Sequence, residues 1–252
     1  MTFAVAAEAY DRFMGRYSVP LAPNFASFAD VAGGQRVLDV GCGPGALATE
    51  LVKRLGALAV VAVDPSSSFV EATRERLPGV DVRQASAEEL PFADRSFDAA
   101  LAQLVVHFMA DPVAGLAEMA RVTRVGGTVA ATVWDHAGGN GPLGMFWDAA
   151  RTIDPGLVDE SGLPGAREGH LPELFAAAGL REIEASTLSV SIEHPTFDEW
   201  WEPFTLGVGP AGAYTVGLSP TRQAELRELC RAGFPDEPFV VTARAWAARG
   251  LA

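Results

Sequence analysis

Residues 36–55 read RVLDVGCGPGALATELVKRL, and this stretch decides the fold. Its first five residues form a short apolar run, which predicts a buried β-strand. The glycine-rich turn GCGPG (41–45) follows, and the apolar residues of ALATELVKRL (46–55) then recur at helical spacing. A strand that enters a helix through a glycine-rich turn is typical of the first unit of an α/β fold that binds a ligand at this turn.

The same alternation continues through the first half of the chain. Further strands are predicted at 57–64, 79–85, 96–103 and 126–134, and helices at 68–77 and 114–122. These strands are apolar on both faces, which is typical of a parallel sheet covered by helices on both sides. The sequence therefore predicts the α/β class with a doubly wound sheet.

The pattern changes after Trp134, where a glycine-rich loop begins. The remaining sequence predicts helices at 145–153, 171–178 and 221–230, strands at 181–192 and 238–250, and an aromatic segment at 196–204. The residues before the first strand have helical character. Because no linker separates these parts, we expect a single domain over 1–252, which consists of an N-terminal cover (1–35), a cofactor-binding core (36–135) and substrate-side insertions with the last strands (136–252).

The charge balance limits the partners of the chain. Its 252 residues include 19 basic and 32 acidic ones, and the formal net charge of −13 disfavours binding to nucleic acid and to anionic membranes. Two cysteines, Cys42 and Cys230, are too few for a disulfide framework. The N-terminal residues lack the basic region of a signal peptide, and the longest apolar run (57–63) is too short to span a bilayer. We therefore expect a cytoplasmic protein, and the sequence indicates no oligomeric state.

Polar groups at the glycine-rich turn indicate a nucleoside cofactor. Glycines allow a ligand to approach the backbone, and the first amides of the following helix are free to bind it. Asp64, which ends the second predicted strand, can accept two hydrogen bonds from a ribose diol. Asp39, just before the turn, is unfavourable beside a pyrophosphate but favourable beside an ammonium or a sulfonium. The turn also lacks the third glycine of G-x-G-x-x-G, so it fits a cationic nucleoside better than NAD, with an NAD(P)-dependent oxidoreductase as the alternative.

Four further segments carry a family resemblance. They are VLDVGCGPGALATEL, VVAVDPSSSFVEAT, ASAEELPFADRSFDAALAQLVVHFMADP and EMARVTRVGGTVAATVWD, which cover most of residues 37–135. In this order they resemble the class I S-adenosylmethionine-dependent methyltransferases, in particular the small-molecule group of the ubiquinone and menaquinone C-methyltransferases (methyltransferase type 11). The segments AYDRFMGRYS, WWEPF and ARAWAARG are similar to one bacterial subgroup. The resemblance implies a mostly parallel, seven-stranded Rossmann-like sheet and S-adenosylmethionine as the cofactor.

The resemblance also assigns residues to the methionine end of the cofactor. Those at the glycine-rich turn are Asp39, Gly41, Cys42 and Gly43. Those that follow the fourth predicted strand are Gln103, Leu104 and His107. In the predicted cover, Tyr10 and Arg16 either close over the cofactor or meet its carboxylate; the alternative is that they belong to an ordinary surface helix.

For the adenosine end, the resemblance implies that Asp64 holds the ribose hydroxyls and that Pro65 and Phe69 pack near the adenine. Ala87 and Glu88 would contact the edge of the adenine. Ser86 stands where the family commonly has an aspartate. Because serine is shorter and uncharged, the contact to the adenine amino group is expected to be weaker or mediated by water.

Other polar and aromatic residues are candidates for the acceptor side. His107 either acts as a base or packs at a helix start, while Asp135 and His136 are expected to have loop-surface or capping roles. The aromatic residues of the C-terminal third either line a pocket for a flat or apolar acceptor or form a small core; they are Trp147, Trp200, Trp201, Phe204 and Tyr214. No catalytic residue is assigned beyond His107 as a candidate.

Several catalytic signatures are absent from the sequence. The four histidines lack H-E-x-x-H spacing and the two cysteines make no zinc motif, so we expect no metal site. There is no G-x-S-x-G nucleophile motif, and QLVV (103–106) replaces the D/N-P-P-Y/F tetrapeptide of methyltransferases that modify DNA bases. The sequence thus predicts methyl transfer by in-line displacement to a small-molecule acceptor of unknown identity. The alternatives are the oxidoreductase and a catalytically silent protein that binds S-adenosylmethionine.

Overall fold

A single seven-stranded sheet organises the chain. The computed structural model describes residues 7–252, so the first six residues, which belong to the predicted cover and to the segment searched for a signal peptide, lie outside the described residues. The strand order is β3-β2-β1-β4-β5-β7-β6, and β7 is antiparallel to both of its neighbours. The strands are β1 (Val37–Val40), β2 (Val60–Asp64), β3 (Asp81–Gln84), β4 (Phe97–Gln103), β5 (Thr123–Trp134), β6 (Arg181–His194) and β7 (Phe239–Leu251). The predicted doubly wound, mostly parallel sheet is confirmed.

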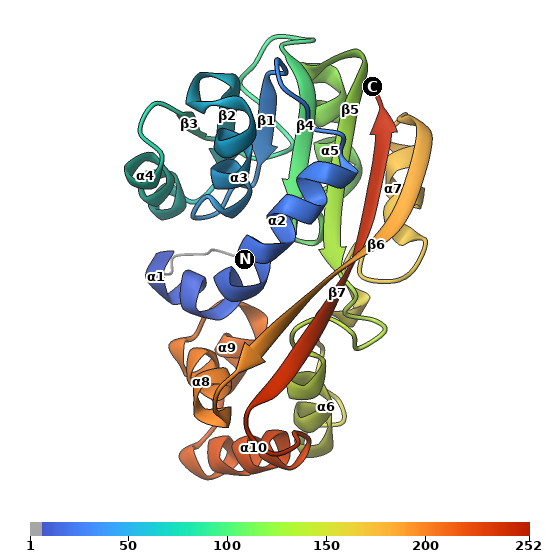
Figure 1. Ribbon diagram of the computed structural model, residues 1–252. Coiled ribbons are helices and arrows are strands. Elements are labelled where there is room, and N and C mark those ends of the chain that lie inside the picture. The colour runs from blue at the N-terminus through green and yellow to red at the C-terminus, as the bar shows by residue number, and fades with distance from the viewer. Residues whose placement is uncertain (1–6) are drawn as a thin grey trace.

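Helices cover both faces of the sheet (Figure 1). They are α1 (Ala7–Tyr10), α2 (Arg16–Phe28), α3 (Ala46–Leu55), α4 (Ser67–Arg76), α5 (Pro112–Val122), α6 (Gly144–Ile153), α7 (His170–Ala177), α8 (Phe197–Trp201), α9 (Gly209–Gly217) and α10 (Pro220–Ala232). The central strands alternate between two cores: Leu38 packs in one cluster with Leu116 of α5, while Val37 packs in another with Phe25 of α2. Buried apolar residues on both strand faces therefore produce the layered structure. No helix within residues 7–252 is long and apolar enough to cross a membrane.

The structure differs from the prediction at the start of β2 and at helix α9, besides small shifts at other element ends. Residues Ala57–Ala59 form a 3₁₀ turn, and β2 begins only at Val60, because Gly56 with φ of 86° turns the chain before the strand. Helix α9 was not predicted, since its sequence GPAGAYTVG contains three glycines and a proline. Its buried residues, Ala211 among them, pack into the aromatic core of the C-terminal third, and this tertiary packing outweighs the low helix propensity.

Strands β6 and β7 extend beyond the sheet and carry a second group of helices. The two strands pair antiparallel from Arg181 opposite Leu251 to His194 opposite Phe239. Figure 1 shows their far ends reaching α6, α8, α9 and α10. The core of this group consists largely of aromatic side chains, including Phe146, Trp200 and Phe204. The chain therefore has a sheet part and a helical part, and α2 of the N-terminal cover lies across the strands (Figure 1).

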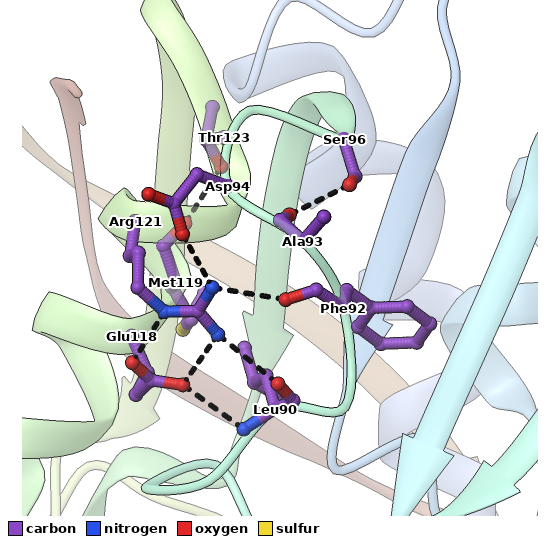
Figure 2. A network of polar contacts seen from close by, with 9 residues as sticks. All are labelled: Leu90, Phe92, Ala93, Asp94, Ser96, Glu118, Met119, Arg121 and Thr123. Atoms are coloured by element: carbon purple, nitrogen blue, oxygen red, sulfur yellow. Dashed lines mark hydrogen bonds and ion pairs between the residues drawn. The ribbon is translucent and has the colours of Figure 1, made fainter.

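A network around Arg121 fastens the segment between β3 and β4 to helix α5 (Figure 2). The Arg121 guanidinium donates to the carbonyls of Phe92 (2.9 Å) and Leu90 (3.0 Å) and pairs with Asp94 (2.8 Å) and Glu118 (2.6 Å). Glu118 also accepts from the Leu90 amide at 3.0 Å. Because this network fixes Leu90 and Phe92, it also limits the position of the preceding residues 86–88, which were predicted to contact the adenine.

Candidate active site

The glycine-rich turn after β1 is attached to β2 by its backbone. The amides of Gly41 and Cys42 both donate to the Val63 carbonyl, at 2.8 and 2.9 Å. The Gly43 amide donates to Asp64 Oδ2 at 2.9 Å. Gly41, Gly43 and Gly45 have φ values of 71°, 53° and 94°, which side-chain-bearing residues rarely adopt. The sequence GCGPG is therefore needed for the path of this turn.

A pocket with about 330 Å³ of space, part of which is open solvent, lies over the turn, where β1 and β4 end. Its lining includes six of the predicted cofactor residues, namely Tyr10, Asp39, Gly41, Cys42, Gly43 and Gln103. The other lining residues are Ser18, Pro44, Ala46, Leu47 and Val105. A Cβ atom placed on Gly43 would meet no atom within 4 Å, so this glycine presents bare backbone to open space. We call this space the glycine-loop cavity.

Several buried polar atoms in the glycine-loop cavity have no hydrogen-bond partner. Asp39 is 1% exposed, and neither of its carboxylate oxygens is hydrogen-bonded. Gln103 donates through Nε2 to the Ser18 carbonyl at 3.0 Å, which leaves Gln103 Oε1 and Ser18 Oγ without partners. Burial, and secondarily the charge of Asp64, raises the pKa of Asp39 to about 8; the Ala48 amide, which lies near the carboxylate without meeting hydrogen-bond geometry, offsets only part of this rise. These unpartnered acceptors fit a ligand that brings a cation with several hydrogen-bond donors, such as an ammonium group.

The predicted ribose and adenine residues lie next to the turn, at the end of β2. Asp64 accepts from the Ser66 amide at 2.8 Å in addition to Gly43, and burial raises its pKa. Tyr10 packs edge-on against Phe69 with ring centroids 5.3 Å apart, so the N-terminal cover touches the start of α4. The Pro65 carbonyl accepts from Gln84 at 2.9 Å.

Residues Ser86, Ala87 and Glu88 are held mainly by structural contacts. Ala87 is buried in the core beneath α5. Glu88 Oε1 accepts from the amides of Ala110 (2.8 Å) and Asp111 (3.2 Å) at the start of α5. These two bonds give Glu88 a structural role, while Ser86 lies between β3 and the buried Ala87.

A second pocket, with about 440 Å³ of space of which part is open solvent, adjoins the first, since Tyr10 lines both. Its walls are mainly apolar, and its residues are Tyr10, Phe13, Met14, Leu104, His107, Phe108, Trp134, His136, Leu143, Glu160, Val208, Gly209 and Pro210. The predicted Leu104 and His107 thus face this space rather than the glycine-loop cavity. Tyr10, Met14 and Ser18 recur every four residues, a spacing that would have indicated one face of the N-terminal helices. We call the second space the acceptor cavity.

Three titratable side chains of the acceptor cavity are buried together. His107, His136 and Glu160 are 5%, 7% and 4% exposed. Burial lowers the pKa of His107 and lowers that of His136 to about 4, so both imidazoles are neutral, and it raises the pKa of Glu160 to about 7. The expectation that His136 has a loop-surface role was wrong, because β5 and the pocket wall bury it. No sequence signal identified Glu160, which follows Asp159 in a glycine- and proline-rich loop.

The remaining candidates have structural positions. Asp135 accepts from Arg244 (2.5 Å), Trp246, Asn140 and Gly138, so it holds a turn after β5 and is buried rather than on the surface. Arg16 bonds His194 and the Glu199 carbonyl, both at 3.1 Å, and lines neither cavity described above. The aromatic residues of the C-terminal third form a core rather than the acceptor cavity; Trp147, Trp200, Trp201 and Phe204 are buried in it and Tyr214 packs against it.

The sheet order, with β7 antiparallel between β5 and β6, and the glycine-rich turn after β1 are those of the Rossmann-like methyltransferase fold. The methyltransferase domain family matches residues 38–131. An uncharacterized methyltransferase of Mycobacterium tuberculosis is 35% identical over 191 residues, 73% of this chain and 70% of that one. A fatty-acid O-methyltransferase of Mycolicibacterium smegmatis is 34% identical over 144 residues, 53% of this chain and 52% of that one. A putative methyltransferase from Bacillus halodurans has a similar crystal structure, with a TM-score of 0.59 at 17% identity over 91% of this chain and 97% of that one.

The chain therefore belongs to the methyltransferase family, and its cofactor is S-adenosylmethionine. The similarity to the Mycobacterium tuberculosis protein covers more than two thirds of both chains, so it includes more than the glycine-rich turn. None of these relatives supports the oxidoreductase alternative.

Proposed function

We propose that this methyltransferase binds S-adenosylmethionine in the glycine-loop cavity and methylates an apolar small molecule held in the acceptor cavity. When bound, the cofactor supplies a methyl group that its sulfonium already activates. The protein then has to hold the acceptor in line with this group and exclude water. The observation that carries the proposal is the unpartnered, buried carboxylate of Asp39 in a cavity that adjoins a second, apolar one.

The residues of the glycine-loop cavity suit the two ends of the cofactor. Asp39, Gln103 Oε1 and Ser18 Oγ would accept hydrogen bonds from the ammonium of the methionine part, which is a charge-assisted contact for Asp39. A carboxylate has about four lone-pair positions, so Asp64 retains acceptor capacity for a ribose diol beyond its two backbone bonds. Tyr10 and Phe69 would flank the adenosine end.

The acceptor cavity favours a molecule with an apolar body. Its side walls come from Phe13, Phe108, Trp134 and Leu143, and its polar side chains gather at one place, His107, His136 and Glu160. One relative, from Mycolicibacterium smegmatis, is a fatty-acid O-methyltransferase, which agrees with an apolar acceptor that carries a polar head.

We further propose that 1–252 acts as one catalytic domain. The two cavities take residues from the N-terminal cover (Tyr10), from the core (Asp39, Leu104) and from the C-terminal insertions (Glu160, Val208). Removal of any of these parts would open a cavity wall.

Calorimetric titration with S-adenosylhomocysteine tests cofactor placement. We expect saturable binding by the wild type and at least tenfold weaker binding by Asp64→Ala, while Asp148→Ala, an exposed acidic residue of α6, serves as the matched control. Absence of binding at millimolar ligand, or equal affinity in all three proteins, would contradict the placement.

A second experiment tests the acceptor class. Transfer of labelled methyl groups is compared between two sets of acceptors of similar size: apolar acids, alcohols and phenols in one set, and strongly charged molecules in the other. Turnover restricted to the charged set would exclude an apolar acceptor.

A further inference from the structure

Three side chains that can ligate a metal meet in one wall of the acceptor cavity. One ring nitrogen of His107, one ring nitrogen of His136 and one carboxylate oxygen of Glu160 lie within 4.8 Å of one another. His107 belongs to a short 3₁₀ helix after β4, His136 follows β5, and Glu160 begins another 3₁₀ helix, Glu160–Gly162. Only the fold brings them together, so the spacing rules that predicted no metal site could not detect this cluster.

The cluster has an excess of acceptors over donors. His107 Nδ1 and His136 Nε2 are buried without hydrogen-bond partners. Among the residues that the structure describes, the side chains of the cluster receive a hydrogen bond from a single donor, Trp147 Nε1, which lies 3.1 Å from Glu160 Oε2. Arg151, the nearby cation, pairs instead with Asp148 and Asp159. Burial of such groups without compensation is costly, and a bound cation supplies the missing partner.

We propose that His107, His136 and Glu160 bind a divalent transition-metal ion, of which Zn²⁺ suits two imidazoles and one carboxylate best. A point equidistant from atoms 4.8 Å apart lies about 2.8 Å from each of them, so shifts below about 1 Å give normal Zn–N and Zn–O bonds of about 2.0–2.2 Å. The Trp147 bond to Oε2 orients the Glu160 carboxylate in the way that outer hydrogen bonds orient metal ligands.

Three protein ligands leave a coordination position open toward the cavity. The lining of this cavity is otherwise mainly apolar, and it adjoins the glycine-loop cavity at Tyr10. An ion there would bind a hydroxyl, phenol, enol or carboxyl oxygen of the acceptor and leave its apolar body against Phe13, Phe108 and Leu143. This assignment of the acceptor class rests on the proposed function, whereas metal binding itself does not.

The test uses the full chain after treatment with a chelator and dialysis. Calorimetric titration with ZnCl₂ is expected to show one site per chain with a Kd in the micromolar range or below, and Co²⁺ is expected to give the visible absorption bands of a four-coordinate ion. Glu160→Gln preserves shape and the Trp147 contact, and His136→Ala removes one imidazole. Both variants should bind at least tenfold more weakly. His170→Ala, which removes a histidine outside the cluster, should bind as the wild type does.

Two outcomes would overturn the metal site. One is the absence of a stoichiometric ion and of four-coordinate Co²⁺ bands in the wild type. The other is unchanged Zn²⁺ affinity in Glu160→Gln, with thermal unfolding used to verify that the variant is folded. Titration of the same samples with S-adenosylhomocysteine reports on the cofactor cavity independently. A chain that binds this ligand but no metal therefore disproves the metal site and leaves the proposed function intact.

Discussion

The substitution Asp39→Asn removes the negative charge of this side chain but keeps its size and shape, so it tests what the charge contributes to stability and to cofactor binding. In the folded chain, burial raises the pKa of Asp39 from 3.8 to about 8. The folded chain therefore holds a proton that the unfolded chain releases. This contribution to stability is fully present below the unfolded pKa of 3.8 and is lost as the pH rises toward about 8. The loss is at most about 1.4 kcal/mol per pH unit. Asparagine does not titrate, so we expect the cofactor-free variant to be more stable than the wild type by about 2–4 kcal/mol near neutral pH.

Cofactor affinity is expected to change in the opposite direction. A charge-assisted hydrogen bond between a buried carboxylate and an ammonium contributes about 1.5–3 kcal/mol, so Asp39→Asn should weaken S-adenosylhomocysteine binding about 10- to 150-fold. Because only the ionised carboxylate pairs with a cation, wild-type affinity should also rise with pH up to about 8. The variant should lack this part of the pH dependence.

Urea unfolding and calorimetry over a pH series measure both quantities on the same two proteins. The difference between wild type and Asp39→Asn isolates this group from the other titrating residues. Asp148→Asn, exposed on α6, is the control for a generic loss of negative charge. Lower stability of Asp39→Asn throughout the series, or undiminished affinity for the ligand, would refute the reasoning that Asp39 is a strained, cation-binding carboxylate.

Three further substitutions test the turn and the network around Arg121. Urea unfolding measures the change in stability, and calorimetry measures ligand binding by Gly43→Ala. Gly41→Ala combines a φ of 71° with a Cβ placed 2.5 Å from Val105, so it should lower the free energy of unfolding by about 2–4 kcal/mol. The control Gly34→Ala, at a φ of 89°, meets no atom within 4 Å and should lower it by only about 1–2 kcal/mol. Gly43→Ala adds a methyl group in open space, so it should weaken S-adenosylhomocysteine binding at least tenfold with only the strain cost in stability; unchanged affinity would place the ligand elsewhere. Arg121→Met removes the donor shared by Leu90, Phe92 and Glu118 and should lower the free energy of unfolding by about 2–3 kcal/mol. Arg124→Met loses one exposed ion pair and should lower it by less than about 1 kcal/mol. Equal losses in the two variants would contradict a network role for Arg121.

Local sequence patterns predicted the sheet because its strands and helices are specified by nearby residues. The turn GCGPG, strand β1 up to Val40, the end of β2 at Asp64 and helix α3 at Ala46–Leu55 follow directly from periodicity and glycine placement. Five of the six predicted residues that line the glycine-loop cavity lie at the ends of β1 and β4, which are neighbours at the point where strand order reverses, while Tyr10 comes from the N-terminal cover. The position of this cavity in the sheet could therefore be predicted from local sequence.

The acceptor side could not be predicted in the same way, because its residues meet only through tertiary structure. His136 and Glu160 lie 24 positions apart along the chain, in loops without periodic pattern, and the long pairing of β6 with β7 determines where the C-terminal helices sit. The roles of the aromatic residues could not be predicted for a related reason. Buried aromatic side chains such as Trp147 and Phe204 occur both in cores and in pocket walls, and the sequence does not distinguish the two positions. Propensity also failed at α9, where packing maintains a glycine-rich helix.

The cost of the unpartnered polar atoms connects the two cavities. Within the described residues, buried side-chain atoms without partners include those of Ser18, Asp39 and Gln103 in one cavity and of His107 and His136 in the other. Each such atom lowers stability by about 1–3 kcal/mol, and apolar side chains of similar size would avoid this loss. The stability of the fold therefore does not explain why these atoms cluster. Ligands would explain it, if one supplies hydrogen-bond donors in the glycine-loop cavity and a cation binds in the acceptor cavity. Removal of these groups should consequently raise the stability of the free protein while it weakens ligand binding, as proposed in detail for Asp39.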